Sequence, residues 1–271
     1  MKCLKNIALI LITGSFTACN HGVQGNKQPT GAKDTLTYNY KTFKQRDADC
    51  GNSPDSTCTI AKITYPDFDS KKTLNDSVTR SFIKLFATNT GKTDTGYSQL
   101  ANNFIGTYKA FKKEQPKSTL IFLLDGHARV LKQDSDILTV EISGYSYSGG
   151  PHGVDLTSYV NWDKKTNKSI ALSNILVAGY QDKLNHIAEK IFRKNEKLLD
   201  TAKLNNGRTY FFKDNKFSLP DNYLILPEGI RFLYNVYTIK PYVAGKTELL
   251  VPYTQIKALL LPNSAVKNHT K

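Results

Sequence analysis

Hydrophobic positions in the first part of the chain recur with two different periods. Segments 34–42 and 58–65 place β-branched and aromatic residues in near alternation with polar ones, which predicts two strands. We expect the second strand to end at Pro66, because proline has no backbone donor for a ladder. Apolar residues then return at helical spacing and predict an amphipathic helix over 70–88. A second helix, ending by Pro116, is marked by Leu100, Phe104, Tyr108 and Phe111.

The middle of the chain alternates again and predicts more strands. Segments 120–124 and 127–132 are both strand-like, and the residues between them, Asp125 and Gly126, are typical of a turn. Apolar and polar side chains also alternate in two later segments, as they do in half-buried strands. These segments are 138–143 and 154–162.

The longest run at helical spacing is 180–204, which we expect to end at the Asn-Asn-Gly of 205–207. Its apolar stripe consists of Leu184, Ile187, Ala188, Ile191, Leu198 and Leu199. Further strands and a last short helix are predicted at 223–226, 230–237, 249–251 and 253–261. This order of elements favours an α+β fold, with mixed or antiparallel sheets and packed amphipathic helices, over regular βαβ winding.

The first residues have the layout of an export signal. Lys2 and Lys5 precede the apolar run 7–12, which is too short to span a bilayer, and small residues lead to Cys19. This order predicts a signal peptide over 1–18 and resembles the lipobox of bacterial lipoproteins, in which the cysteine is lipidated after cleavage. Segment 19–35 then forms a flexible tether. The alternative is an ordinary secreted protein in which Cys19 has no special role.

Cysteine usage agrees with an extracytoplasmic location. Cys3 leaves with the signal peptide and Cys19 takes the lipid, so Cys50 and Cys58 remain as an even pair in an oxidising compartment. A disulfide between them closes a short turn-rich loop and contributes roughly 2–3 kcal/mol on the chain-entropy model. A metal pair is the alternative, but no other cysteine and no nearby histidine completes a zinc site. We expect no metal and no cofactor.

The chain is strongly basic, with a formal charge of +14, and loss of Lys2 and Lys5 with the signal peptide leaves +12. In the cell envelope the anionic partners are lipid headgroups and wall polymers, so we expect no nucleic-acid partner. Basic side chains gather in 109–117 and 190–197, which could face such a polymer. The simpler interpretation is that they are solvated helix faces.

The best candidate for a binding site is the turn 148–153. Its glycines permit positive φ and close backbone approach, and His152 lies at its tip. Three tyrosines on the polar side of the flanking strands could add a ledge for a sugar or a peptide. The glycines are Gly149, Gly150 and Gly153, and the tyrosines are Tyr145, Tyr147 and Tyr159. The alternative is a plain hairpin whose tyrosines only cover the sheet.

Enzymatic chemistry at this turn would use His152 as a base. A base of this kind needs an oriented partner and a nucleophile. Asp155 is near in sequence, but the chain has no strained serine turn of the hydrolase type. We therefore expect no enzymatic activity.

Three groups of motifs together resemble a known arrangement. They are Tyr65-Pro66 ahead of a helix with Asn75; 145–153 with 161–168 and 172–176; and 226–232 with 237–245 and 251–256. They resemble the paired extracytoplasmic modules of the lysozyme-sensing anti-sigma factor, which also occur beside a peptidoglycan deacetylase and alone in bacterial lipoproteins. The resemblance implies two intimately associated modules and a tail. These are 36–165, of the deacetylase-associated type; 166–262, of the anti-sigma-factor ectodomain type; and 263–271.

The resemblance also implies a non-catalytic recognition module, because the deacetylase chemistry of those relatives belongs to a separate domain. Lysozymes are commonly cationic, and a +12 domain would repel them unless its charge is segregated. We therefore expect a lipid-anchored module on the outer membrane or the outer face of the inner membrane. Its ligand would be a wall glycan, a surface polyanion or an envelope protein. The alternatives are an envelope hydrolase that uses His152 and an inert structural lipoprotein.

Overall fold

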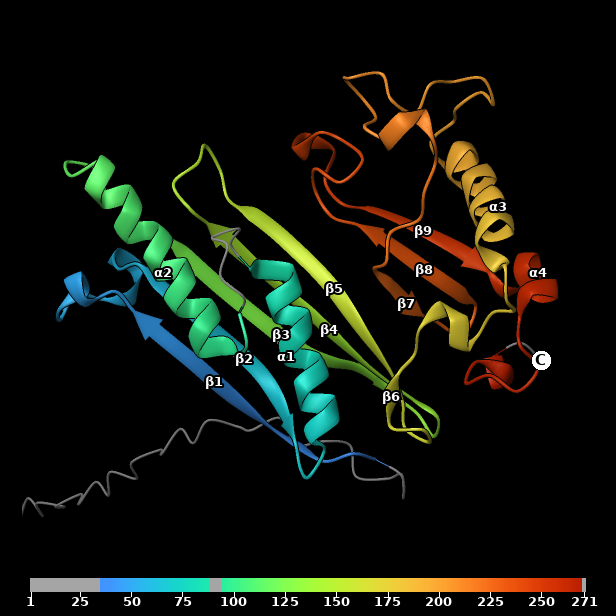
Figure 1. The fold of residues 1–271 in the computed structure, drawn as a ribbon, viewed down its shortest axis with the longest axis horizontal. Helices are drawn as coiled ribbons and strands as arrows, with labels where there is room; N and C mark the ends of the chain where they lie inside the picture. Colours follow the sequence, from blue (N-terminus) through green and yellow to red (C-terminus); the bar gives the residue numbers. More distant parts are fainter. Residues whose placement is uncertain (1–34, 88–93, 270–271) are drawn as a thin grey trace, which may run out of the picture. The chain divides into compact units, whose positions relative to one another are not determined.

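The structure is a computed structural model that describes residues 35–87 and 94–269 (Figure 1). The predicted signal peptide 1–18, the lipidation site Cys19 and the tether up to residue 34 lie outside the described residues. Two sheets and four α-helices confirm the predicted α+β fold. Within the described ranges, no helix has both the length and the apolar character needed to cross a bilayer.

The larger sheet has six strands in the order β1-β2-β3-β4-β5-β6. All neighbours are antiparallel except β2 and β3, which are parallel because helices α1 and α2 form the crossover between them. The strands are β1 (Tyr38–Arg46), β2 (Ile60–Phe68), β3 (Leu123–Gln133), β4 (Ile137–Tyr147), β5 (Val154–Asp163) and β6 (Lys168–Ser169). The helices are α1 (Lys72–Phe86) and α2 (Tyr97–Glu114), close to their predicted positions.

Helices α1 and α2 lie over one face of this sheet and bury its apolar side chains (Figure 1). The helices contribute Leu74, Val78, Phe82, Leu100 and Phe104, and the strands contribute Ile63, Leu124, Val140, Ile142 and Val160. Successive strand residues point to opposite faces, so the neighbours of these residues in sequence form the other, more polar face.

Asp125 and Gly126 do not form the predicted turn, because β3 runs through them as one strand. The glycine has a packing role instead. A Cβ atom at Gly126 would lie 2.9 Å from Cε1 of Phe82, so only glycine lets the α1 ring approach the strand this closely. The glycine at position 126 therefore marks a close contact with helix α1 and not a reversal of the chain.

Pro66 does not end β2, which continues to Phe68. Strand β2 pairs with β3 only over residues 60–64, so at Pro66 its one neighbour is β1, where Pro66 lies opposite Tyr40. A proline without an amide donor is tolerated where one side of the strand has no partner. The turn into α1 is then held by Asn75, whose Oδ1 accepts from the backbone N–H of Phe68 at 2.9 Å.

The smaller sheet is antiparallel and has the order β7-β8-β9. Helices α3 and α4 pack on it and enclose a second apolar cluster, which includes Leu184, Ala188, Phe192, Phe232 and Val251. The strands are β7 (Tyr223–Ile225), β8 (Gly229–Tyr234) and β9 (Thr247–Pro252), and the helices are α3 (Tyr180–Asn195) and α4 (Tyr253–Ile256).

Helix α3 ends at Asn195, well before the predicted stop at 205–207. Lys197 adopts a φ of 55°, and the next amide, that of Leu198, donates to the carbonyl of Arg193 at 2.8 Å. These are features of a Schellman cap, in which glycine is usual and lysine is not. Leu199 is consequently 77 % exposed and does not belong to the predicted apolar stripe.

Asparagine side chains join the two sheets. Asn161 of β5 donates to the carbonyl of Tyr223 at 2.8 Å and accepts from the amide of Ile225 at 3.1 Å. The backbone of Thr157 is held in the same way, since its amide donates to Asn235 at 2.9 Å and its carbonyl accepts from Asn222 at 2.8 Å. At Thr157 the edge of β5 is therefore hydrogen-bonded to asparagine side chains, whereas at Trp162 and Asp163 it pairs with β6.

Candidate functional site

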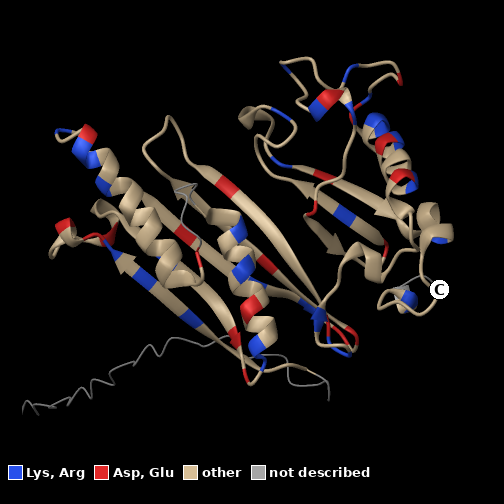
Figure 2. Cartoon of the chain, in the orientation of Figure 1, with Lys and Arg blue, Asp and Glu red and all other residues tan. Residues whose placement is uncertain are grey.

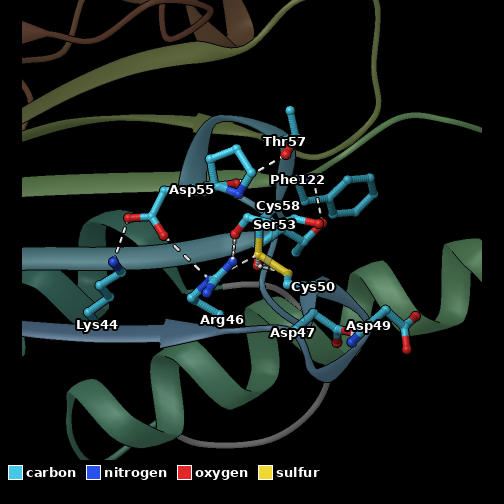
Figure 3. The surroundings of a disulfide bond; sticks show 12 residues. Lys44, Arg46, Asp47, Asp49, Cys50, Ser53, Asp55, Thr57, Cys58 and Phe122 are labelled. Atoms are coloured by element: carbon cyan, nitrogen blue, oxygen red, sulfur yellow. Dashed lines mark hydrogen bonds and ion pairs between the residues drawn. A yellow bond between two sulfur atoms is a disulfide. The ribbon is translucent and has the colours of Figure 1, made fainter.

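The predicted disulfide between Cys50 and Cys58 is present, with Cα atoms 5.4 Å apart (Figure 3). It closes the connection between β1 and β2. Arg46 of β1 donates from Nε to Sγ of Cys58 at 3.4 Å. Asp55 in the loop forms ion pairs with Lys44 at 2.5 Å and with Arg46 at 3.4 Å. The hydrogen bond from Lys44, helped by the charge of Arg46, lowers the pKa of the Asp55 carboxyl.

The hairpin of β4 and β5 carries the predicted binding residues. Tyr145, Tyr147 and Tyr159 lie on the sheet face away from α1 and α2, since β4 directs the residues of opposite parity, such as Ile142, into the helix-covered core. Tyr145 is opposite Asp155 near the tip, whereas Tyr159 is opposite Glu141 farther along the strand. Burial raises the pKa of Tyr159, and the charge of Glu141 raises it further.

The three glycines of the turn have different roles. Only Gly149 has a positive φ, 82°, and a Cβ there would lie 2.8 Å from Cε1 of Phe122. Gly153 is needed for a close approach, because a Cβ at this position would overlap the ring of Tyr145. Gly150 meets neither condition, since its nearest neighbour, the carbonyl oxygen of His152, would be 3.8 Å from a Cβ. The expectation of positive φ therefore holds for Gly149 alone.

His152 extends from the tip to two tyrosines that follow β8. Its ring stacks on Tyr242, with centroids 3.9 Å apart and planes inclined by 17°. It also stacks beside Tyr237 with centroids 6.1 Å apart, and the Tyr237 hydroxyl lies 3.1 Å from Nε2 of His152. We call His152, Tyr237 and Tyr242 the hairpin-tip aromatic cluster.

The segment that carries Tyr242 is also tied to β5 beside the aromatic cluster. Lys246, just beyond Tyr242, forms an ion pair with Asp155 and donates to Oγ1 of Thr157 at 2.8 Å. Tyr237 has a φ of 65°, a conformation that costs a non-glycine residue of order 1–3 kcal/mol and recurs at ligand-binding sites. Tyr237 is nonetheless 52 % exposed, and Val243 next to the cluster is 92 % exposed.

Sequence reasoning missed Tyr237 and Tyr242 as partners of His152. Tyr237 is 85 residues from His152, and nothing in the local pattern connects them. The signal that was available is that both tyrosines lie in one short segment, between the end of β8 at Tyr234 and the start of β9 at Thr247. The ledge predicted from Tyr145, Tyr147 and Tyr159 shares the hairpin with His152, but the rings that stack on His152 come from this other segment.

The surroundings of His152 are suited to stacking. Its ring nitrogens contact the Tyr237 hydroxyl and, at 3.4 Å, the carbonyl of Gly153. Asp155, the acid nearest to it in sequence, is paired with Lys246. Across residues 35–87 and 94–269, no three His, Cys, Asp or Glu side chains come together as a possible metal site.

The basic helices are mixed in charge. Figure 2 shows Lys and Arg interspersed with Asp and Glu along α3. Arg193 there is paired with Glu189 at 2.8 Å, and Lys112 of α2 donates to the carbonyl of Ser118 at 2.7 Å. These contacts favour solvated, partly neutralised helix faces over a single polyanion-binding stripe.

Comparisons with known proteins bear on the fold. No curated protein matches the chain. A crystal structure of a DUF3298 family member from Bacteroides fragilis NCTC 9343 is similar, with a TM-score of 0.65 and 17 % identity over 88 % of this chain and 99 % of that one. A DUF3298 family protein from Pseudomonas aeruginosa PAO1 has a TM-score of 0.62 and 19 % identity, over 85 % and 96 % of the two chains. Residues 173–254 match the family described as "Protein of unknown function (DUF3298)", so the chain contains a DUF3298 domain.

Proposed function

We propose that the chain is a lipid-anchored, non-catalytic binding module of the cell envelope, which contacts wall glycan through the hairpin-tip aromatic cluster. The envelope location is supported by the export signal and the lipobox-like residues ending at Cys19. The Cys50–Cys58 disulfide also supports it, because such bonds persist in oxidising compartments.

The observation that carries the proposal is the exposed aromatic cluster. The faces of sugar rings are partly apolar and pack on flat aromatic side chains, while their hydroxyls need polar groups at the ring edge. Tyr237 presents both, since it is 52 % exposed and its hydroxyl lies beside Nε2 of His152. Because the rings already stack on one another, little side-chain entropy remains to be lost on binding.

The positive charge has a supporting part in this function. A net charge of +12 after loss of the signal peptide attracts the domain to anionic polymers and headgroups. That attraction is long-range and is screened by salt. Stacking on the aromatic cluster depends much less on salt, so ionic strength separates the two contributions.

The test is retention of the purified chain on isolated peptidoglycan. We expect retention that persists at high salt and is lost in the Tyr237→Ala/Tyr242→Ala variant. Tyr40→Ala is the matched control, because Tyr40 is 50 % exposed and lies on β1, outside the cluster. Equal retention of the parent and the double variant would contradict the proposal, and so would retention that salt abolishes completely.

Two further measurements address the alternatives. Turnover of wall fragments that disappears in His152→Ala would replace the proposal with an envelope hydrolase. Absence of retention on any envelope polymer would favour an inert structural lipoprotein. Mass spectrometry of the mature amino terminus checks the anchor, because we expect a cleaved and acylated Cys19.

A further inference from the structure

The two cysteines of the disulfide differ in their surroundings. Cys58 is 2 % exposed and has Nε of Arg46 at 3.4 Å from its sulfur, whereas Cys50 is partly exposed. A thiolate that arrives from solvent therefore meets Cys50 first, and Cys58 is the leaving group. The guanidinium of Arg46 favours the thiolate that forms on Cys58, because a neighbouring positive charge stabilises a sulfur anion. This arrangement suits reduction from the Cys50 side.

The disulfide lies against the backbone of Thr59. Sγ of Cys50 and Sγ of Cys58 are 3.7 Å and 3.3 Å from the carbonyl oxygen of Thr59, which also accepts from the amide of Asp47 at 2.9 Å. Thr59 is 2 % exposed, so it has close neighbours on all sides. When the bond opens, the two sulfurs separate from bonding distance to van der Waals distance. The contacts of Thr59 must then change.

Thr59 holds the backbone of Phe122, which lies beside the disulfide loop (Figure 3). The amide of Phe122 donates to Oγ1 of Thr59 at 2.9 Å, and its carbonyl accepts from the amide of Ile60 at 3.1 Å. Both backbone groups of Phe122 are thus bonded to the two residues that follow Cys58. A displacement of Thr59 is therefore passed to a residue 63 positions later in the chain.

The ring of Phe122 in turn supports the hairpin tip. On one side it packs against three aromatic rings of α2, those of Phe104, Tyr108 and Phe111. On the other side a Cβ at Gly149 would lie 2.8 Å from its Cε1, so Gly149 rests directly on the ring. Gly149 belongs to the same turn as His152. In a close-packed interior a displaced Phe122 changes its contact with this turn.

We propose that the Cys50–Cys58 disulfide is a redox-sensitive regulator of the hairpin-tip aromatic cluster. A dithiol reductant opens the bond, which removes the support that the tip receives through Thr59 and Phe122 and weakens binding at the cluster. The effect on binding rests on the proposed function, whereas the effect on the conformation of the tip does not.

The reduction takes place in two exchange steps. A thiolate of the reductant attacks Sγ of Cys50, the bond between the two cysteines breaks, and Cys58 leaves as a thiolate that takes up a proton. The second thiolate of the reductant then attacks the mixed disulfide and releases Cys50, which is also protonated. The chain gains two electrons and two protons, and the reductant leaves as a disulfide.

The experiment is backbone amide NMR of the purified full chain before and after reduction with dithiothreitol. We expect the signals of Gly149 and His152 to shift on reduction, together with those of the loop 47–60, whereas the exposed Leu199 beyond α3 should not respond. The Cys50→Ser/Cys58→Ser variant should already show the shifted tip signals and should be insensitive to dithiothreitol. Unchanged signals of Gly149 and His152 in the reduced parent would overturn the proposal.

A matched pair of substitutions at Thr59 tests the route to the tip. Thr59→Val keeps the shape of the side chain but removes the oxygen to which Phe122 donates. Reduction of this variant should shift the loop signals and affect Gly149 and His152 much less than in the parent. Thr59→Ser keeps the oxygen and should respond like the parent. Equal tip shifts in the two variants would overturn the route through Phe122.

The rate of reduction tests the part of Arg46. Arg46→Gln should be reduced about threefold more slowly than the parent, because the leaving thiolate loses its guanidinium partner. Lys44→Gln is the control, since Lys44 pairs with Asp55 and should leave the rate unchanged. Equal rates in the two variants would overturn the assignment of Cys58 as the leaving group.

Retention on isolated peptidoglycan separates this inference from the proposed function. The reduced parent should be retained about fivefold more weakly than the oxidised parent, the lower end of the usual range for coupled sites. If neither form is retained, the proposed function fails, and the NMR shifts still decide whether the disulfide controls the tip. If both forms are retained equally, the regulation is refuted and the wall contact stands.

Discussion

Two loops of this protein are held in place by opposite means. The loop between β1 and β2 is closed by the Cys50–Cys58 bond, eight residues apart, and by the ion pair between Lys44 and Asp55. The tip between β4 and β5 is held by Tyr237, 85 residues away from His152. The first loop depends on its own neighbourhood in the chain, whereas the second depends on a distant segment that must already be folded.

This difference determines which of the two loops is suited to binding a ligand. The loop between β1 and β2 is closed by a covalent bond, and its Asp55 is already paired with Lys44 and Arg46 of β1. The hairpin tip keeps Tyr237 half exposed while it is ordered by stacking, so it combines a fixed geometry with an available surface. Binding surfaces profit from that combination, because side chains that are ordered in advance lose less entropy when a ligand arrives.

Removing the disulfide should give the largest effect on stability. We expect Cys50→Ser/Cys58→Ser to lose about 2–3 kcal/mol of unfolding free energy, because the unfolded chain regains the freedom of the closed loop. Urea denaturation measures the loss, and reduction of the parent protein should reproduce it. An unchanged midpoint in both cases would mean that local contacts alone hold this loop.

Adding a methyl group at the hairpin tip should come next. Gly149→Ala is expected to cost about 1–2 kcal/mol, because an alanine is strained at a φ of 82°. Its Cβ would also meet the Phe122 ring. Gly150→Ala is the matched control and should change stability little, since its surroundings are open. Thermal unfolding of both variants measures the two losses of stability. Equal losses would contradict the prediction.

The stacking between the two segments can be measured by a double-mutant cycle. His152→Ala and Tyr242→Ala should be coupled by about 0.5–1.5 kcal/mol, the range found for aromatic pairs. The pair His152→Ala and Tyr40→Ala serves as a control and should be additive, because Tyr40 lies on β1. A coupling energy of zero for the first pair would show that the tip is ordered by the hairpin itself.

Acid should have the smallest effect and should act on the disulfide loop. The pKa of Asp55 is lowered below its ordinary value of 3.8 by Lys44 and then by Arg46. The stabilising contribution is therefore complete above about pH 3.8 and is lost as the pH falls through the lowered pKa. In unfolding experiments at low salt, Asp55→Asn should be less sensitive than the parent to this acid range. Identical acid profiles of the parent and the variant would show that the ion pair does not stabilise the loop.

The amino-acid sequence by itself determined the features that depend on near neighbours. The helical spacing of Leu74, Val78 and Phe82 specified α1, because a helix brings such residues to one face whatever the rest of the chain does. Alternation specified β4 and β5 for the same reason. The disulfide could be predicted because Cys50 and Cys58 are the even pair that remains once Cys3 is assigned to the signal peptide and Cys19 to the lipid.

Only the tertiary structure decided the features that need distant residues. Gly126 continues a strand because Phe82 packs over it, and Tyr237 meets His152 because β8 ends beside the hairpin tip. Asn222 and Asn235 reach the backbone of Thr157 because the chain returns to the edge of β5, 65 and 78 residues later. Periodicity follows from backbone geometry over a few residues, whereas these contacts follow from the path of the whole chain, which no local pattern encodes.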